Sequence, residues 1–137
     1  MRNTTGKFNT ASGYLALYYN WTGIENTVVG TRALFDNQTG SYNTVVGGQA
    51  GYKNITGSRN VFIGRQAGYH EEGSNKLYIA NSDSQKPLIK GDFENKTLRV
   101  QGKMYASAYR TISDARLKAD IRPLGSTLDK VLRLGQT

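Results

Sequence analysis

A repeat of 17 residues constrains the fold of this chain more than any other feature of its sequence. Three copies of that length occupy residues 9–25, 26–42 and 43–59, and a shorter fourth copy occupies residues 60–75. Each copy opens with asparagine, followed four residues later by glycine and seven residues later by alanine. Repetition at a fixed short period is typical of solenoids, in which each unit stacks on the next because it cannot bury its apolar side chains alone.

Each copy combines a strand with a turn. The segment Thr-Val-Val-Gly is β-branched and ends on glycine, so it predicts a short strand closed by a turn. The segment Asn-x-Thr-Gly has turn chemistry, because asparagine and glycine both tolerate positive φ. A strand of this length is not stable alone, so we expect the strands of successive copies to pair in register. The predicted apolar columns are Val28, Val45 and Phe62 and, beside them, Val29, Val46 and Ile63.

The other repeated positions are interpreted as scaffold. We expect the asparagines that recur from copy to copy to form hydrogen-bonded ladders at the corners of the coils. An aromatic residue also recurs, and we interpret it as a packing column of Tyr18, Phe35, Tyr52 and Tyr69. Together these features predict a mainly β fold, a parallel β-solenoid over residues 1–74.

The units that open with "NTASG" or "NTVVG" and continue into "NxTG" resemble the head repeats of trimeric autotransporter adhesins and related arrays of bacterial surface proteins. The resemblance covers residues 1 to about 75. It implies a homotrimeric, left-handed parallel β-solenoid in which three chains pack side by side and one apolar column faces the common axis. The chain departs from the family in its longer unit and in Glu71 and Glu72, which stand where earlier copies have "NxTG".

The composition agrees with an oligomer. The chain has 137 residues, of which 37% are hydrophobic and 16 are glycine, so a monomer would bury little of its surface. It has no cysteine, which excludes a disulfide framework and thiolate metal sites. No apolar run approaches the roughly 18 residues that a membrane-spanning helix needs. We expect no cofactor, no metal ion and no membrane insertion of this segment.

The charge is positive and uneven. The formal net charge is +8, with +2 in residues 1–74 and +6 in residues 75–137. A basic half can indicate binding to nucleic acid or to anionic glycans. Here the basic residues are scattered singly, which favours a solvated basic surface, and we expect no nucleic-acid partner.

Residues 75–112 are predicted to form a β connector or neck. The segment "NKLYIANS" at 75–82 alternates apolar and polar residues, as a half-buried strand does. Two further short strands, one with Leu88 and Ile89 and one with Leu98 and Val100, are predicted around a turn at 91–97. An interwoven neck in a trimer and a hairpin within one chain both agree with this pattern.

The pattern becomes helical from Ser113 onward. Ser113 or Asp114 is a suitable helix N-cap, and the residues that follow are helix formers. A short C-terminal helical segment is therefore expected in residues 113–137.

The stretch "ISDARLKADIRPLGSTLDKVLRL" resembles the start of the C-terminal intramolecular chaperone domain of phage endosialidases, tailspikes and tail fibres. These domains are self-cleaving serine–lysine peptidases, and five motif positions match: Ser113, Asp114, Leu117, Lys118 and Ile121. The resemblance implies cleavage between Ile112 and Ser113, with Ser113 as nucleophile and Lys118 as base. It covers only the first part of the family's domain, so we expect residues 113–137 to be a truncated start. In the structural alternative, Ser113 serves only as a helix cap and Lys118 only as a surface charge.

Two functions follow from these resemblances. The first is a trimeric fibre tip or surface-adhesin fragment that binds a cell-envelope or glycan receptor, its trimerisation assisted by the chaperone that self-cleavage releases. The second is a phage tail-fibre or tailspike segment whose only chemistry is self-cleavage at Ile112–Ser113. Either is extracellular, at a bacterial surface or on a virion, and acts on no external substrate.

Aromatic residues of the first copy are the candidates for glycan contact. Tyr14, Tyr19 and Trp21 stand where later copies have mostly polar residues, and exposed aromatic rings can stack on sugars. Packing within the solenoid is the alternative interpretation of these rings.

Overall fold

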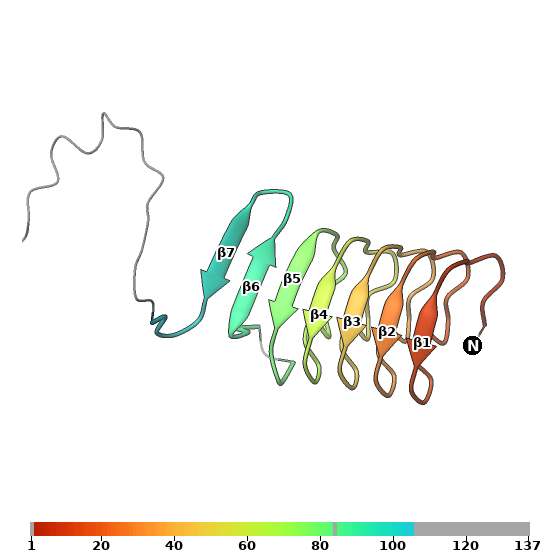
Figure 1. Ribbon diagram of the computed structural model, residues 1–137, viewed down its shortest axis with the longest axis horizontal. Helices are drawn as coiled ribbons and strands as arrows, with labels where there is room; N and C mark the ends of the chain where they lie inside the picture. Colours follow the sequence, from red (N-terminus) through yellow and green to blue (C-terminus); the bar gives the residue numbers. More distant parts are fainter. Residues whose placement is uncertain (1, 84, 106–137) are drawn as a thin grey trace, which may run out of the picture. The chain divides into compact units, whose positions relative to one another are not determined.

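The computed structural model describes residues 2–83 and 85–105, and in this part of the chain the protein is mainly β and contains no helix. Seven strands form one sheet in the order in which they occur along the chain (Figure 1). The strands are β1 (Thr10–Ser12), β2 (Thr27–Val29), β3 (Thr44–Val46), β4 (Val61–Ile63), β5 (Lys76–Ile79), β6 (Ile89–Asp92) and β7 (Thr97–Val100).

The first five strands pair in parallel and belong to successive coils of a β-solenoid of about four turns (Figure 1). Val28 pairs with Val45, and Val45 pairs with Phe62, as the repeat predicts. The neighbouring column is in register too, with Val29 beside Val46 and Val46 beside Ile63. The prediction of a parallel solenoid with these two columns is therefore confirmed.

The core is a single narrow row of side chains. Val28, Val45 and Phe62 face inward from the strands and are fully buried. The opposite wall carries Leu17 and Leu34 in the first two coils and glycine in the next two. A Cβ atom at Gly51 or at Gly68 would lie 2.7 Å from the ring of Phe62, so the two glycines make room for the larger ring.

One asparagine ladder joins the coils at the start of the strands. Asn43 donates its side-chain amide to Oδ1 of Asn26 (3.0 Å) and to the carbonyl of Gly57 (2.9 Å), and its own Oδ1 accepts the backbone N–H of Asn60 (3.0 Å). The contacts recur coil after coil, and Asn60 Oδ1 accepts the backbone N–H of Lys76 (2.9 Å) at the end of the array. These buried amides satisfy backbone groups that water cannot reach.

A second ladder runs through the Asn-x-Thr-Gly turns. Asn37 donates to Oδ1 of Asn20 (2.8 Å) and to the carbonyl of Gly40 (3.0 Å). The same carbonyl also accepts from Asn26 (2.9 Å), so the two ladders meet at the glycine of this turn. The predicted asparagine ladders are confirmed.

The aromatic residues stack along the solenoid. Ring centroids lie 5.6 Å apart between Tyr18 and Phe35, 5.0 Å between Phe35 and Tyr52, and 5.1 Å between Tyr52 and Tyr69, with nearly parallel planes. The interpretation of these four rings as a packing column is confirmed.

Beyond the repeats the sheet continues without a break. β5 pairs in parallel with β4, although the sequence analysis assigns it to the connector, and β6 and β7 then add to the sheet in antiparallel fashion. Both strands expected around the 91–97 turn are present, except that Leu88 lies one residue before β6. The helix expected in residues 113–137 lies outside the described residues.

Replacing Asn43 by alanine tests the ladder. The variant loses two donated bonds and one accepted bond at a buried position. Because unsatisfied buried polar groups cost about 1 to 3 kcal/mol each, the free energy of unfolding should fall by about 3 kcal/mol. Urea unfolding measures the change. Alanine at the exposed Asn81 should change it by less than about 0.5 kcal/mol; equal effects at both positions would contradict a structural role for the ladder.

Candidate interaction surface

The outward side of the sheet carries two columns of side chains and no charge. The middle residue of β2, of β3 and of β4 faces the core, so the residues on either side of it point outward. Strand register extends both columns through β7. We call the following residues the outer face: Thr10, Thr27, Thr44, Val61, Leu77, Gly91 and Leu98 in one column, and Ser12, Val29, Val46, Ile63, Ile79, Ile89 and Val100 in the other.

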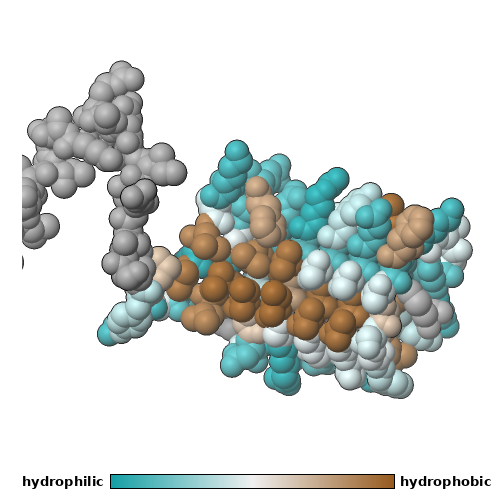
Figure 2. Space-filling model, in the orientation of Figure 1, coloured by the Kyte–Doolittle hydropathy of each residue, from teal (hydrophilic) through white to brown (hydrophobic). Residues whose placement is uncertain are grey.

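The outer face becomes more apolar from β1 to β7. It begins with Thr10 and Ser12 and is almost wholly aliphatic from β4 onward. Val29, Val46 and Ile63 remain 41%, 42% and 40% exposed. Figure 2 shows apolar side chains gathered in a continuous band over the strands. Contiguous exposed apolar surface of this kind marks interaction sites in soluble proteins.

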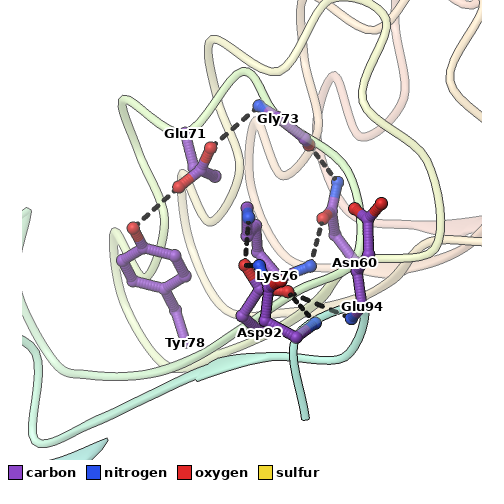
Figure 3. Close-up of polar contacts among 8 residues, drawn as sticks. Asn60, Glu71, Gly73, Lys76, Tyr78, Asp92 and Glu94 are labelled. Carbon is purple, nitrogen blue, oxygen red and sulfur yellow. Dashed lines mark hydrogen bonds and ion pairs between the residues drawn. The ribbon is translucent and has the colours of Figure 1, made fainter. Parts of the chain in front are cut away.

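A polar cluster closes the end of the solenoid where the repeat is lost (Figure 3). Glu71 accepts the backbone N–H of Gly73 (2.8 Å) with one oxygen and the hydroxyl of Tyr78 (2.7 Å) with the other. Tyr78 packs edge-on against Phe62, with ring centroids 5.8 Å apart. The carboxylate of Glu71 and the ring of Tyr78 thus cover the last coil.

An ion pair joins β5 to the β6–β7 hairpin in the same cluster (Figure 3). Lys76 Nζ lies 2.7 Å from Asp92 Oδ2. Asp92 also accepts the backbone N–H groups of Glu94 and Asn95 (both 3.0 Å). The hydrogen bond from Lys76, followed by those from Asn95, holds the pKa of Asp92 well below its usual range, and the same bond raises the pKa of Lys76.

The three aromatic candidates from the first repeat do not form one site. Tyr19 packs edge-on against Tyr18 and Phe35, at 4.9 and 5.1 Å between centroids, and is only partly exposed. Trp21 is 45% exposed, and its carbonyl accepts backbone bonds from the preceding turn. Tyr14 is the most exposed of the three, at 68%, and lines a separate shallow groove. Tyr19 therefore belongs to the packing of the aromatic column.

The sequence alone predicts neither the groove beside Tyr14 nor the polar end cluster. The groove is lined by Tyr14, Thr31, Arg32, Gly48, Gln49 and Arg65. A signal for it does exist, because Gly48 falls in a column where the other copies carry tyrosine, threonine and arginine. The departure of the last copy at Glu71 was visible, but its bond to Tyr78 was not.

The predicted cleavage site, Ile112 and Ser113 with Lys118, lies outside the described residues. Within residues 2–83 and 85–105, no three His, Asp or Glu side chains are grouped so that they could hold a metal ion. The same part of the chain contains no helix that could cross a bilayer.

Comparison with known proteins identified no relative. No protein-family model, no curated protein and no solved structure matches the chain. Its architecture is therefore assigned from the structure alone, as a parallel β-solenoid of about four turns.

The Lys76–Asp92 pair predicts a specific dependence of stability on pH. The pKa of Asp92 is lowered in the folded protein, so its contribution is complete above the unfolded value of about 3.9 and is lost as the pH falls below that value. Asp92→Asn should therefore be less stable than the wild type at neutral pH, and this gap should narrow in acid. Urea midpoints at about pH 7 and about pH 2 measure it. Asp83→Asn removes the same charge outside the pair and should show no such change between the two pH values. A stability difference between wild type and Asp92→Asn that is the same at both pH values would contradict a stabilising Lys76–Asp92 pair.

Proposed function

We propose that this chain is a segment of a homotrimeric extracellular fibre or surface adhesin, assembled by burying its outer face against other copies. The observation that carries the proposal is the uncharged, increasingly apolar outer face of the sheet. Such a module is structural and adhesive and acts on no external substrate.

The narrow core supports assembly. Apart from a row of alanines, only a few large apolar side chains are fully buried in the described residues, among them Leu17, Leu34 and Phe62. More aliphatic groups remain on the outer face, where burial of apolar surface stabilises by about 25 cal/mol per Å². Association with another molecule supplies the burial that one narrow solenoid lacks.

The regular spacing of the outer face favours a copy of the same chain as the partner. Its side chains recur once per coil, at the spacing of paired strands, about 4.8 Å. A surface with the same spacing can pack against the outer face coil by coil. A second copy of the chain has that spacing because it contains the same repeat. The outer face carries no charged side chain, so contact through it does not bring the positive charges of the chain, whose net charge is +8, directly against one another.

The number of copies and the setting come from the sequence resemblance. Trimeric autotransporter head repeats pack three chains around one axis, which makes three the proposed number here. An extracellular position, at a bacterial surface or on a virion fibre, and a cell-envelope or glycan receptor follow from the same resemblance.

A charge in the outer face should break the assembly. Val46→Lys places an ammonium group in the middle of the proposed interface, where burial without a partner is costly. Light scattering of the wild type at micromolar concentration should give three times the chain mass of 15.1 kDa, and the variant should give the monomer mass. Thr56→Lys adds the same charge at an exposed turn position and should remain trimeric. A monomeric wild type would reject the proposal.

For residues 113–137 we propose the start of a trimerisation chaperone that is removed by self-cleavage. The proposal rests on the five matched motif positions, and a serine is a weak nucleophile until a base activates it. In a chain extended to carry the family's complete domain, mass spectrometry should detect cleavage between Ile112 and Ser113. Ser113→Ala and Lys118→Ala should leave that bond intact. An intact wild-type chain, or cleavage that persists in Ser113→Ala, would disprove it.

A further inference from the structure

The groove beside Tyr14 runs along the solenoid across four coils. Tyr14 comes from the first copy, Thr31 and Arg32 from the second, Gly48 and Gln49 from the third, and Arg65 from the fourth. Its volume is about 470 Å³. All of these residues occupy two adjacent columns just after the strands, so the groove is a product of coil stacking.

Gly48 leaves the middle of the groove open, and the backbone does not require glycine there. The contrast with Gly47 is direct: Gly47 has φ +138°, and a Cβ atom on it would clash with the carbonyl of Gly64. Gly48 has no positive φ, and the nearest atom to an added Cβ is the carbonyl oxygen of Thr31 at 3.9 Å. Since threonine occupies the same column one coil earlier, a side chain would be accommodated at position 48. Its absence there creates the hollow.

The groove is positively charged. Arg32 and Arg65 both line it, and neither forms an ion pair with any residue in the described part of the chain. None of the lining residues is acidic. A guanidinium group binds carboxylates through two parallel hydrogen bonds, so two uncompensated arginines favour an anionic ligand with planar acidic groups.

The other lining groups suit a sugar. The ring of Tyr14 is 68% exposed and offers an apolar face on which the C–H face of a pyranose can pack. The side-chain amide of Gln66 donates to Oε1 of Gln49 (3.2 Å), which orients the amide group of Gln49. The NH₂ of Gln49 then remains available to donate to a hydroxyl.

The groove is poorly suited to a peptide. The backbone N–H groups of Arg32, Gln49 and Gln66 already donate to the carbonyls of the preceding coil, at 2.8, 2.8 and 2.9 Å. A peptide strand that added itself here would find these main-chain donors occupied, and such bonds supply most of the affinity in strand addition. Recognition must come from side chains, as it does for saccharides.

We propose that this groove binds an acidic saccharide, with Arg32 and Arg65 contacting sugar carboxylates and Tyr14 packing against a ring. The inference rests on the proposed adhesive function, to which it adds the ligand class and the residues. Of the three aromatic residues that the sequence suggests for glycan contact, only Tyr14 takes part in the proposed site.

The test uses the full chain and three probes of equal length. Trigalacturonic acid carries carboxylates on sugar rings, maltotriose is its neutral counterpart, and triglutamate carries carboxylates on a peptide. In calorimetric titrations, trigalacturonic acid should bind saturably and more weakly as salt is added, because exposed charges are screened. Maltotriose and triglutamate should bind at least about tenfold more weakly, since each lacks one of the two contacts.

Variants locate the binding in the groove. Arg32→Ala and Arg65→Ala should each weaken trigalacturonic acid binding at least about tenfold, because each removes the charge-assisted contact of one guanidinium with a sugar carboxylate. Gly48→Thr should abolish binding by filling the hollow while leaving the urea midpoint unchanged or higher, because it also restricts the unfolded chain. Arg59→Ala removes the same charge from the side chain that lies over Tyr42 and should leave binding unaltered.

Three results would overturn the inference: no binding of trigalacturonic acid, unchanged binding to Gly48→Thr, or equal binding of triglutamate. Light scattering on the same samples separates this inference from the proposed assembly. Trimers that do not bind would reject the groove alone, whereas monomers that bind would reject the assembly and retain the groove.

Discussion

The buried asparagine amides are the interaction on which the structure depends. A coil this narrow turns its backbone inward at the corners, where carbonyl and N–H groups have no access to water. Each asparagine satisfies a glycine carbonyl and links its own coil to the next, as Asn43 does between Asn26 and Asn60. An amide provides a donor and an acceptor from one short side chain, so a single residue type can continue the ladder indefinitely.

The fixed spacing between coils then determines how the core, the groove and the outer face are arranged. Because corresponding residues lie one above another, a change in one column must be compensated in the same coil or an adjacent one. The ring of Phe62 is accommodated by glycine at positions 51 and 68, and Gly48 opens a groove that spans its neighbours. The same rule aligns the aliphatic residues of the outer face into continuous columns, which is why a chain with few large buried side chains can still present a broad apolar surface.

The second asparagine ladder ends at a charged residue. Glu71 takes the place of the next asparagine, and its carboxylate accepts from Gly73 and Tyr78. Oδ1 of Asn37 and of Asn54 are buried and accept no hydrogen bond within the described residues, which marks the coils where the second ladder gives way to this cap. The antiparallel β6–β7 hairpin then covers the last parallel strand, and the Lys76–Asp92 pair fastens it.

Columns were predictable from the sequence because the period is constant, and Val28, Val45 and Phe62 pair as expected. Strands of three residues carry too little alternation to show which column faces inward, so the exposed position of Val29 and Val46 required the structure. The sequence predicts a connector where β5 lies, because the last copy is one residue short and its place in the parallel sheet is hidden. The sequence does not reveal the groove because it depends on a side chain that is absent, at Gly48, and on residues from four copies that lie 17 positions apart in the chain. The motif at Ser113 and Lys118 lies outside the described residues and stays a prediction.

The claim that copies meet through the outer face can be tested by disulfide cross-linking. The chain has no cysteine of its own, so only an introduced cysteine can form a disulfide. A single cysteine at Val46 should form a disulfide between copies under mild oxidation, since Cβ atoms of two cysteines must approach within about 4.5 Å to be joined. A single cysteine at Thr56, exposed on a turn, provides the comparison. Rapid formation of covalent dimers by Val46→Cys, and not by Thr56→Cys, on a denaturing gel is the predicted result. Equal cross-linking of the two variants, or none in Val46→Cys, would contradict it.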